Sequence, residues 1–488
     1  MNKITISVMI SACLAACSGG GEDTNAQAPV GAQAQMAAAA DGRVQALAVS
    51  SLDQASLASR STARDPGPRA SRAAAGAPLA GLSPLELAAF NVGKADFAEA
   101  ESADEEGMGP TMNLDSCGGC HSQPDIGGSA PAVNPQIALA SKLGATNKIP
   151  SFLSLNGPVR EARFVRNPDG TPDGGVHAIF TVAGRSDAVG CDAKQPDFAT
   201  ALANRNVVFR IPTPVFGAGL IEQIPDREIL ANLAKNASAR QGLGIRGRGN
   251  VVMPANGISG QANRNGNDGT LGRFGWKAQN KSLLVFSGEA YNVEMGVTND
   301  LFPTERDENE NCQFVAQPNN VADQTAATPA EQMSGIEKFA TYMRLLAPPQ
   351  ASTHSPGGGP SITAGRALFD STGCALCHTP SMKTGNARID SMRAKTVNLF
   401  SDLLIHDMGI GLADGVSQGQ ANGREFRSAP LWGLGQRLYF LHDGRTMDLR
   451  QAVIAHRSEG SEANEVVARF TRLADREQQD LLNFLRSL

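Results

Sequence analysis

Apolar residues recur at helical spacing in several parts of this 488-residue chain, and these parts define its expected helices. At 334–346 they fall three or four residues apart, and the pattern stops at Pro348 and Pro349, which cannot continue a helix. The last residues, 481–488, show the same spacing. An earlier helix should begin at 83–86, where Ser-Pro-Leu-Glu combines a capping box with proline at the first helical position. The pattern predicts a mainly α protein.

A different pattern occupies residues 160–183, where short apolar runs are separated by turn residues. The turn residues are Asn-Pro-Asp-Gly at 167–170 and Asp-Gly-Gly at 173–175. Runs of this length around such turns favour a β-hairpin. We therefore expect a hairpin insert in an otherwise helical region.

The first twenty residues have the features of an export signal. Lys3 supplies a positive charge, an apolar stretch follows, and Leu-Ala-Ala-Cys at 14–17 resembles the lipobox of bacterial lipoproteins. This predicts a lipoprotein signal peptide at 1–16 and lipid on Cys17, with an ordinary secretory signal as the alternative. The protein would then face the periplasm of a bacterial cell envelope, bound to the membrane through its N-terminal lipid.

Residues 17–80 are rich in Ala, Gly, Ser, Gln and Pro and contain few large apolar residues. Such a segment cannot bury a core, so we expect a disordered tether over this range. No later segment contains 18 consecutive apolar residues, the length that a membrane-spanning helix needs. The net charge of −5 is mild and shows no basic stripe, so nucleic acid is not an expected partner.

The pentapeptide Cys-x-x-Cys-His occurs twice, far apart, and is the attachment signal for a covalent c-type haem. With 8 Cys and 7 His in the chain, roughly 0.002 such pentapeptides would be expected by chance. Two thiols three positions apart lie on one side of a helical turn and can add to the two vinyl groups of one porphyrin, and the adjacent imidazole can bind the iron. We therefore expect two covalently bound haem c groups. The attachment residues are Cys117, Cys120 and His121, and Cys374, Cys377 and His378.

Two other uses of Cys-x-x-Cys are less well supported. A closed zinc site needs four ligands, usually with a second Cys or His pair a short loop away, and neither copy has one. A thioredoxin-type redox pair would need a βαβ pattern and does not require the His that follows.

An apolar helix closes each of the two haem-bearing stretches, as in a duplicated cytochrome c unit. We expect an N-terminal haem domain at 81–347, a Pro- and Gly-rich linker at 348–360 and a C-terminal cytochrome c domain at 361–488. The N-terminal domain is the longer one and should be enlarged by loop and β-hairpin inserts. These inserts are the expected determinants of the substrate.

Two cysteines remain after the signal peptide, the lipid site and the haem sites are assigned. They are Cys191 and Cys312. In an oxidising compartment a disulfide between them is the preferred interpretation, and two unpaired structural thiols are the alternative.

His456 is the histidine whose position best fits a further iron ligand. Leu449, Ala452, Val453 and His456 fall at i, i+3, i+4 and i+7, so the imidazole projects from the apolar face of a short helix that begins near Asp448. A lone histidine on an apolar face is more often a core residue, but a haem domain makes the ligand role the better hypothesis.

Several short segments resemble the di-haem oxidoreductases, a family also labelled thiol oxidoreductase or peroxidase. The resemblance runs from about residue 81 to the end of the chain, and the family is related more distantly to bacterial di-haem cytochrome c peroxidases, to the methylamine-dehydrogenase maturation enzyme and to rubber oxygenases. The segments are Gly-Met-Gly-Pro at 107–110, Arg-Phe-Gly-Trp-Lys-Ala at 273–278, Tyr-Asn-Val-Glu-Met-Gly at 291–296, Leu-Ile-His-Asp-Met-Gly at 404–409, Ala-Pro-Leu-Trp-Gly at 429–433 and Leu-His-Asp-Gly-Arg at 441–445.

The resemblance implies a ligand for the second haem. The peroxidases place it fourteen residues after the His of a His-Asp-Gly-like motif, which leads here from His442 to His456. That ligand is Met in the peroxidases, so His456 implies a bis-His haem, as in the rubber oxygenases. His442 would be a nearby structural group, and His406 and Met408 are weaker ligand candidates.

The resemblance also implies an acid at the first haem. The peroxidases carry it in an Asn-x-Glu-Met segment, which matches 292–295 and makes Glu294 the candidate catalytic acid and base. Their Gln and Pro upstream of it are replaced here by Leu284 and Gly288, which leaves peroxide and O₂ both open as the oxidant.

The tryptophan that lies between the haems of the peroxidases corresponds to Phe274, and Trp276 is close enough to take its place. Trp432-Gly433 replaces the segment that helps to hold calcium in the peroxidases, so calcium is not expected.

These residues together predict a peroxidase-like di-haem oxidoreductase. The second haem would accept electrons from a donor protein, a small cytochrome or a cupredoxin, and pass them to the first, which would activate peroxide. The alternatives are an enzyme that uses O₂ on an organic or protein substrate, and an electron carrier without catalytic activity.

Overall fold

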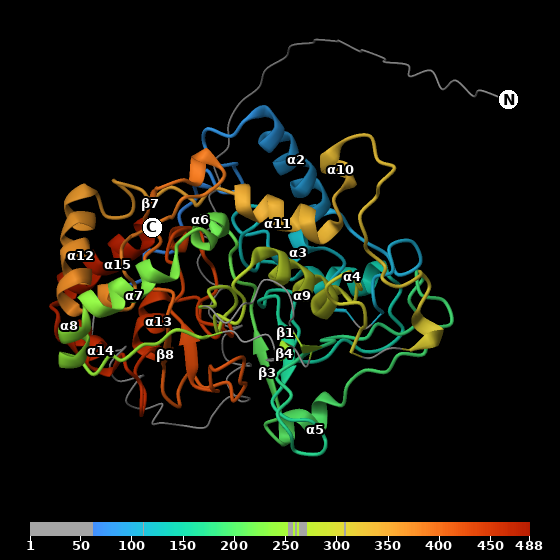
Figure 1. Ribbon diagram of the computed structural model, residues 1–488. Helices are drawn as coiled ribbons and strands as arrows, with labels where there is room; N and C mark the ends of the chain where they lie inside the picture. The colour runs from blue at the N-terminus through green and yellow to red at the C-terminus, as the bar shows by residue number, and fades with distance from the viewer. Residues whose placement is uncertain (1–61, 111, 252–256, 259–260, 263–270, 307–308) are drawn as a thin grey trace, which may run out of the picture. The chain divides into compact units, whose positions relative to one another are not determined.

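The computed structural model describes residues 62–110, 112–251, 257–258, 261–262, 271–306 and 309–488, and it is rich in helices with few strands (Figure 1). This confirms the mainly α prediction. The signal peptide, Cys17 and most of the predicted tether lie outside the described residues. The helices are α2 (Pro84–Ala98), α3 (Cys117–Cys120), α4 (Pro135–Lys142), α5 (Phe198–Ala203), α6 (Ala218–Glu222), α7 (Asp226–Lys235), α8 (Ala237–Gly242), α9 (Leu283–Met295), α10 (Pro329–Gln332), α11 (Gly335–Leu345), α12 (Gly359–Thr372), α13 (Leu449–Ala455), α14 (Asn464–Arg472) and α15 (Asp475–Ser487), with short 3₁₀ turns η1 (Glu310–Cys312), η2 (Cys374–Leu376), η3 (Asp390–Met392) and η4 (Leu434–Gln436).

Helix α2 begins where the sequence signal places it. The Ser83 side chain accepts a hydrogen bond from the Glu86 backbone N–H, and the Glu86 carboxylate accepts one from the Ser83 N–H at 2.7 Å. This reciprocal pair satisfies two N–H groups at the start of the helix.

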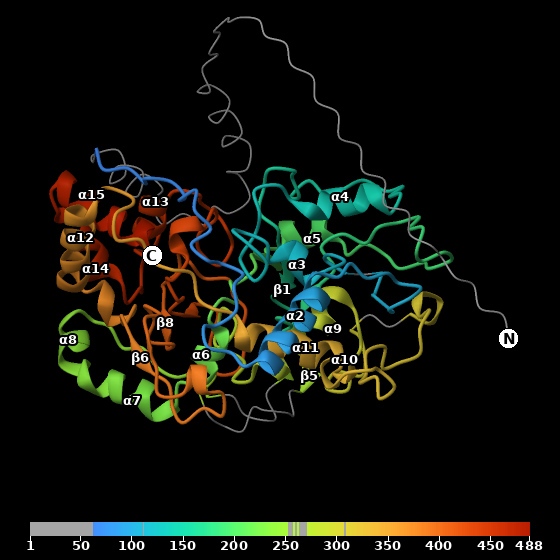
Figure 2. The same ribbon diagram turned by 90° about the horizontal axis from the view of Figure 1, so that it is seen from above.

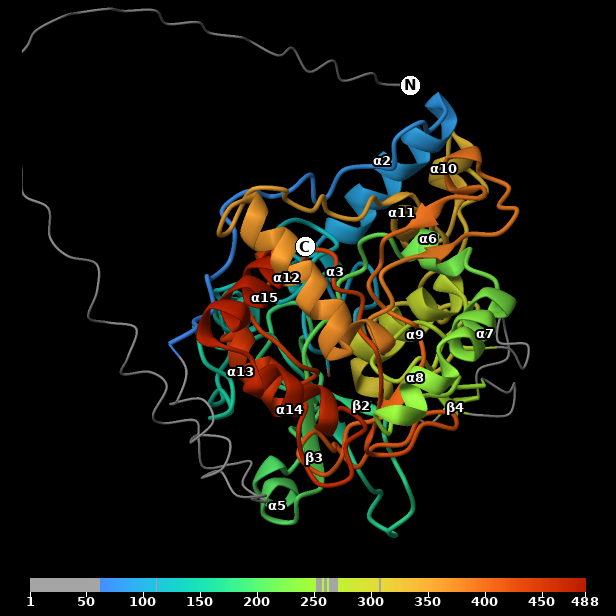
Figure 3. The same ribbon diagram turned by 90° about the vertical axis from the view of Figure 1, so that its left-hand side faces the viewer.

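The same kind of helix crossing occurs twice, each time between a helix that precedes a Cys-x-x-Cys-His motif and a helix that follows it. Helix α2 packs on α11, and α12 packs on α15, as Figures 1 and 3 show. Each first helix carries a glycine at the contact. A Cβ at Gly93 would lie 2.4 Å from the Lys338 carbonyl oxygen, and one at Gly365 would lie 1.9 Å from the Asp480 carbonyl oxygen. Only glycine permits so close an approach of the two backbones.

The residue four positions after each of these glycines is a phenylalanine, on the same face of its helix. Phe97 and Phe369 are both fully buried. Phe97 packs against Tyr342 of α11 at 5.0 Å between ring centroids, and Phe369 packs against Phe484 of α15 at 5.3 Å. The two halves of the chain therefore pack their helices in the same way. In each half, the attachment motif lies close to the end of the helix pair.

Antiparallel strands confirm the predicted hairpin and add a third strand to it. Strands β1 (Glu161–Phe164), β2 (Val176–His177) and β3 (Val207–Arg210) form a sheet in the order β2-β1-β3, with Ala162 opposite both His177 and Phe209. The other strands pair in twos: β4 (Gly257–Ile258) with β5 (Gln261–Ala262), β6 (Met382–Lys383) with β7 (Thr396–Val397), and β8 (Ile405–Asp407) with β9 (Glu425–Arg427).

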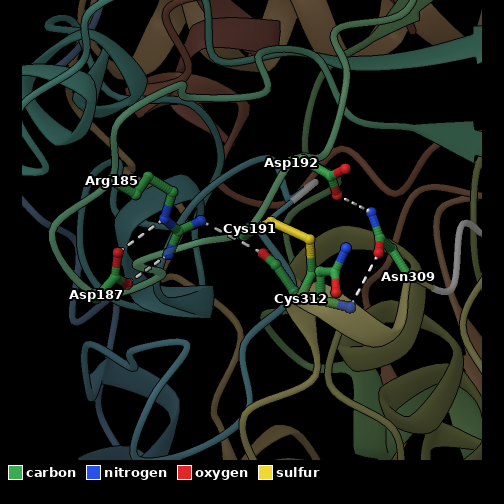
Figure 4. The surroundings of a disulfide bond; sticks show 8 residues. Arg185, Asp187, Cys191, Asp192, Asn309 and Cys312 are labelled. Atoms are coloured by element: carbon green, nitrogen blue, oxygen red, sulfur yellow. Dashed lines mark hydrogen bonds and ion pairs between the residues drawn. A yellow bond between two sulfur atoms is a disulfide. The ribbon is translucent and has the colours of Figure 1, made fainter.

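A disulfide joins Cys191 to Cys312, the pairing that the sequence analysis preferred (Figure 4). Beside it the Asn309 side-chain amide donates to the Asp192 carboxylate at 2.7 Å. These two links, one covalent, fasten two long loops together across a sequence separation of 121 residues.

The predicted tether is wrong for its last part, because residues 62–80 make ordered contacts with the C-terminal helices. The Asp65 carboxylate forms a buried bidentate ion pair with Arg486, at 2.6 and 2.7 Å. Thr62 donates to the Asp475 carboxylate. Composition misled here because a segment that adds one buried charge pair to an existing fold needs no apolar core of its own.

The main apolar core extends past the expected linker. It is built mostly from residues before 347, but Val397, Leu403 and Leu404 belong to it. A second cluster is formed by residues of α12, α13, α14 and α15, helices that lie near one another in Figure 2, together with Ala63. Among the described residues, no helix has both the length and the apolar character needed to cross a bilayer.

Substituting alanine for Gly365 should weaken the α12–α15 crossing, because its Cβ would overlap the Asp480 carbonyl. We expect a destabilisation of about 1–3 kcal/mol, seen as a lower midpoint of thermal unfolding. The matched control is Gly242→Ala at the end of α8, where a Cβ would meet nothing within 4 Å and should stabilise slightly. An unchanged midpoint for Gly365→Ala would show that the crossing is looser than described.

Candidate functional site

Two cavities lie next to the two Cys-x-x-Cys-His motifs. The first has an empty volume of about 1010 Å³, including its opening, and is lined by Cys117, Cys120 and His121. The second has an empty volume of about 1330 Å³ and is lined by Cys374, Cys377 and His378.

The imidazoles of the two motifs are oriented in the same way. The Nδ1–H of His121 donates to the Gly128 carbonyl at 3.0 Å, and the Nδ1–H of His378 donates to the Phe400 and Ala429 carbonyls at 3.1 and 3.2 Å. A carbonyl can only accept, so the proton is on Nδ1 and Nε2 keeps its lone pair. This arrangement is typical of a metal-binding histidine.

His456 lines the second cavity together with His378. It follows the last residue of α13, and its Nδ1–H donates to the Ala452 carbonyl at 2.7 Å, which again leaves Nε2 free. Asp448 caps the start of this helix by accepting from the Gln451 N–H at 2.8 Å. The structure thus brings together the two histidines that the sequence analysis assigned to one iron.

Burial keeps these three imidazoles neutral. It lowers the pKa of His121 and of His456 below their usual value. Burial, together with the nearby His456, lowers the pKa of His378 to about 4. Neutral imidazole is the form that binds a metal ion.

His406, one of the weaker ligand candidates, has both ring nitrogens occupied. Nδ1 lies 2.9 Å from the Glu462 carboxylate and Nε2 lies 3.1 Å from the Asp402 carboxylate. Burial alone would lower the pKa of His406, but its interactions with Cys377 and Asp402 raise it well above the usual range. An imidazole in this doubly hydrogen-bonded, charged state has no lone pair for iron, so the structure favours His456 over His406, which stays a weaker candidate. Met408 lines the second cavity and stays a candidate.

Glu294 lines the first cavity from the last turn of α9. Phe286 and Ala290, eight and four positions before it, line the same cavity, so they share one face of the helix with Glu294. Its backbone is fixed by Asn113, which also lines this cavity and whose backbone N–H donates to the Glu294 carbonyl at 2.9 Å. The acid that the sequence analysis selected therefore lies in the cavity of His121.

Two charged residues of the hairpin also reach this cavity, and the sequence analysis did not select them. Glu161 and Arg163 stand two positions apart on β1, so they share a face of the strand, and both line the cavity. Arg163 donates to the Glu161 carboxylate at 2.6 Å and to the Gly174 carbonyl at 2.8 Å. The sequence shows that the charged Glu161 and Arg163 alternate with the apolar Ala162. This alternation does not indicate which face of the strand is buried.

These groups change the proton affinity of Glu294. Burial is the first cause of a pKa raised to about 8, and the negative charge of Glu161 adds to it. Arg163 opposes the increase. Glu294 therefore exchanges a proton near neutral pH, as a catalytic acid and base must.

Trp276 lines both cavities. Its indole N–H donates to the Ile211 carbonyl at 2.9 Å, which fixes the ring. Phe274, which corresponds to the tryptophan of the peroxidases, is buried against Phe286 instead and lines neither cavity. Trp276 is thus the aromatic residue at the boundary of the two sites.

His442 is a structural neighbour of this boundary. Its ring stacks on Phe426 at 4.3 Å between centroids and meets the Trp276 ring edge-on at 6.3 Å. Burial lowers the pKa of His442 to about 4, so the ring is uncharged. This packing agrees with the expectation that His442 is a structural group near the second haem and not its distal ligand.

This chain resembles one known protein family over most of its length. A family model described as "Di-haem oxidoreductase, putative peroxidase" matches residues 160–488, which is about two thirds of the chain. The match begins later than residue 81, the start that the resemblance had implied, so it includes the second attachment motif and Glu294 but not the first motif.

Among solved structures, the hydrazine synthase of Kuenenia stuttgartiensis pressurized with 20 bar xenon matches at 18% sequence identity. The match covers 33% of this chain and 56% of the hydrazine synthase chain, with a TM-score of 0.21, and we base no argument on it. No curated protein matches this chain.

Proposed function

Because this chain belongs to the di-haem oxidoreductase family, we propose that it reduces peroxide in the cavity that contains Glu294, using electrons taken up at the cavity that contains His456. The observation that carries the proposal is the position of a carboxyl group with a pKa of about 8 in the same cavity as the His121 imidazole. A surface glutamate would have neither property.

We propose that both haem groups are covalent and of the c type. Cys117 and Cys120 would hold one and Cys374 and Cys377 the other, and these four thiols form no disulfide. The repeated glycine-mediated helix crossing supports two cytochrome c-type units, at 81–347 and 361–488. A denaturing haem stain with a mass measurement should count two haems, and a count of one or none would exclude this assignment.

Haem groups, when bound in the two cavities, supply iron centres that take up electrons singly and deliver them to peroxide. His121 would bind the first iron, and His378 and His456 would bind the second. The Nδ1–H bonds of these three imidazoles keep each ring in the tautomer that has a free Nε2.

Glu294 carries the proton chemistry. Its carboxylate removes the proton from one peroxide oxygen and returns it to the other, which leaves as water when the O–O bond breaks. Two electrons from the donor and two protons from solvent then convert the remaining oxygen to a second water. The negative charge of Glu161 helps to keep the pKa of Glu294 high enough for the return step, and Arg163 holds the Glu161 carboxylate in place through their ion pair. Trp276 lies between the cavities, where an aromatic ring can assist electron transfer from the second site to the first.

We propose that the protein acts in the periplasm, anchored by lipid on Cys17, and that a small cytochrome or cupredoxin delivers its electrons. The lipobox-like Leu-Ala-Ala-Cys and the haem-attachment motifs support export, because haem c is attached outside the cytoplasm. Membrane fractionation of Cys17→Ala tests the anchor, since the variant should appear in the soluble fraction.

Replacing His456 by alanine should open the second iron to external ligands. Wild type should show one low-spin, bis-His iron without the sulfur-to-iron charge-transfer band, and His456→Ala should bind cyanide or carbon monoxide at that iron. Absorption and EPR spectra measure both properties. Met408→Leu is the control, and if it changes the spectrum while His456→Ala does not, the ligand is Met408.

Replacing Glu294 by glutamine keeps the size of the side chain and removes the base. Both haems should stay attached and reducible, while peroxide turnover falls at least about a hundredfold. Unchanged turnover would contradict the role of Glu294. A wild-type protein that consumes O₂ and does not react with peroxide would favour the oxygenase alternative.

The pH profile gives a second test of the same group. The base is the ionised form, so turnover should rise as the pH increases through about 8, the pKa of Glu294. Glu161→Gln should move this rise to lower pH, because it removes a negative charge that raises the pKa. Glu161→Asp retains the charge and should leave the midpoint near its wild-type pH.

A further inference from the structure

Two arginines of the second cavity are buried without a carboxylate. Arg427 on β9 is 9% exposed, Arg437 after η4 is 8% exposed, and both line this cavity. Over the residues that the structure describes, neither forms an ion pair, and Nε and Nη2 of Arg437 have no hydrogen-bond partner. Burial lowers the pKa of both to about 10, which still leaves them charged at neutral pH.

Other buried arginines of this protein do have an acidic partner. Arg210 pairs with Asp414 at 2.6 Å, and Arg240 pairs with Asp402 at 2.8 Å. A buried charge without a partner costs several kcal/mol, so proteins rarely keep one without a ligand. Two guanidinium groups that line one cavity without an acidic partner are therefore suited to an anion with two negative groups.

Both arginines also touch Trp276. The Arg427 backbone N–H donates to the Trp276 carbonyl at 2.8 Å, and its Nε donates to the Gly275 carbonyl at 2.9 Å. The Arg437 guanidinium lies 5.8 Å from the centre of the indole ring. The Arg437 carbonyl accepts a hydrogen bond from Arg486 at 2.8 Å, which fixes its backbone. The pair is thus held rigidly at the boundary with the first cavity.

We propose that Arg427 and Arg437 bind the two propionate carboxylates of the haem attached at Cys374 and Cys377, and so direct that edge of the haem toward Trp276. The inference rests on the covalent haem of the proposed function. A haem carries two carboxylates on one edge, which matches two guanidinium groups side by side, and arginine is the side chain best suited to bind carboxylate.

The test is the reduction potential of the second haem, measured by redox titration without peroxide. Arg437→Met removes a positive charge beside the haem edge and should lower the equilibrium constant for reduction at least tenfold, or 59 mV for one electron. Arg437→Lys keeps the charge and should change the constant less than threefold. Arg388→Met, an exposed arginine that lines neither cavity, is the matched control.

Propionate binding also predicts a change in pH dependence. In wild type the potential should be constant from pH 6 to 8, because paired propionates stay ionised, and a slope should appear in Arg437→Met. If the Met variant does not accumulate, Arg427→Gln should give the same slope while keeping a donor for the Gly275 carbonyl.

A potential in Arg437→Met within threefold of the control would overturn the proposal. A wild-type potential that changes with added inorganic phosphate would also overturn it, because the arginines would then bind a free anion. A haem stain made first separates these outcomes from a failure of the proposed function, which would show as a missing haem or as an absent reaction with peroxide.

Discussion

Two hydrogen bonds of the Ile211 backbone link the two cavities. The Ile211 carbonyl accepts from the Trp276 indole N–H at 2.9 Å, and the Ile211 N–H donates to the His442 carbonyl at 2.8 Å. Ile211 is buried and directly follows β3, so the sheet fixes its position. A buried donor left without its partner costs about 1–3 kcal/mol, and Trp276 is therefore held in one orientation. The electron transfer proposed between the two cavities depends on the position of this ring, because Trp276 lines both.

The two cavities differ in how their charged groups are partnered. In the first, Arg163 is paired with Glu161 and Arg210 with Asp414, while burial and the charge of Glu161 raise the pKa of Glu294 to about 8. In the second, Glu462 is bonded to His406, whereas Arg427 and Arg437 form no ion pair among the residues that the structure describes. In the proposed function, a carboxyl group that keeps its proton near neutral pH would serve the cleavage of peroxide. Guanidinium groups without an acidic partner would stabilise the reduced state of a haem and the ionised form of its propionates.

Local signals predicted the parts of this molecule that depend on neighbours in the sequence. The capping box at Ser83, the hairpin turns and the spacing that leads to His456 each follow from a few adjacent residues. Glu161 and Arg437 could not be predicted in this way. The role of Glu161 depends on which face of its strand is buried, and the role of Arg437 depends on the absence of a carboxylate partner. Both properties are set by contacts between distant segments of the chain. The ordered segment around Asp65 escaped prediction for the same reason, since its partner Arg486 is 421 residues away.

The three-stranded sheet would serve both the proton transfer and the electron transfer of the proposed mechanism. This limits how the protein can vary. Strand β1 places Glu161 beside Glu294, whereas β3 ends at Arg210, which is paired with Asp414 from the C-terminal part of the chain. The next residue, Ile211, fixes Trp276. Because β1 and β3 are neighbours in one sheet, a shift of the hairpin that altered the proton affinity of Glu294 would also displace the ring between the cavities. In the proposed function, proton transfer and electron transfer would therefore be coupled through one sheet, and a change in substrate would require both to be adjusted together.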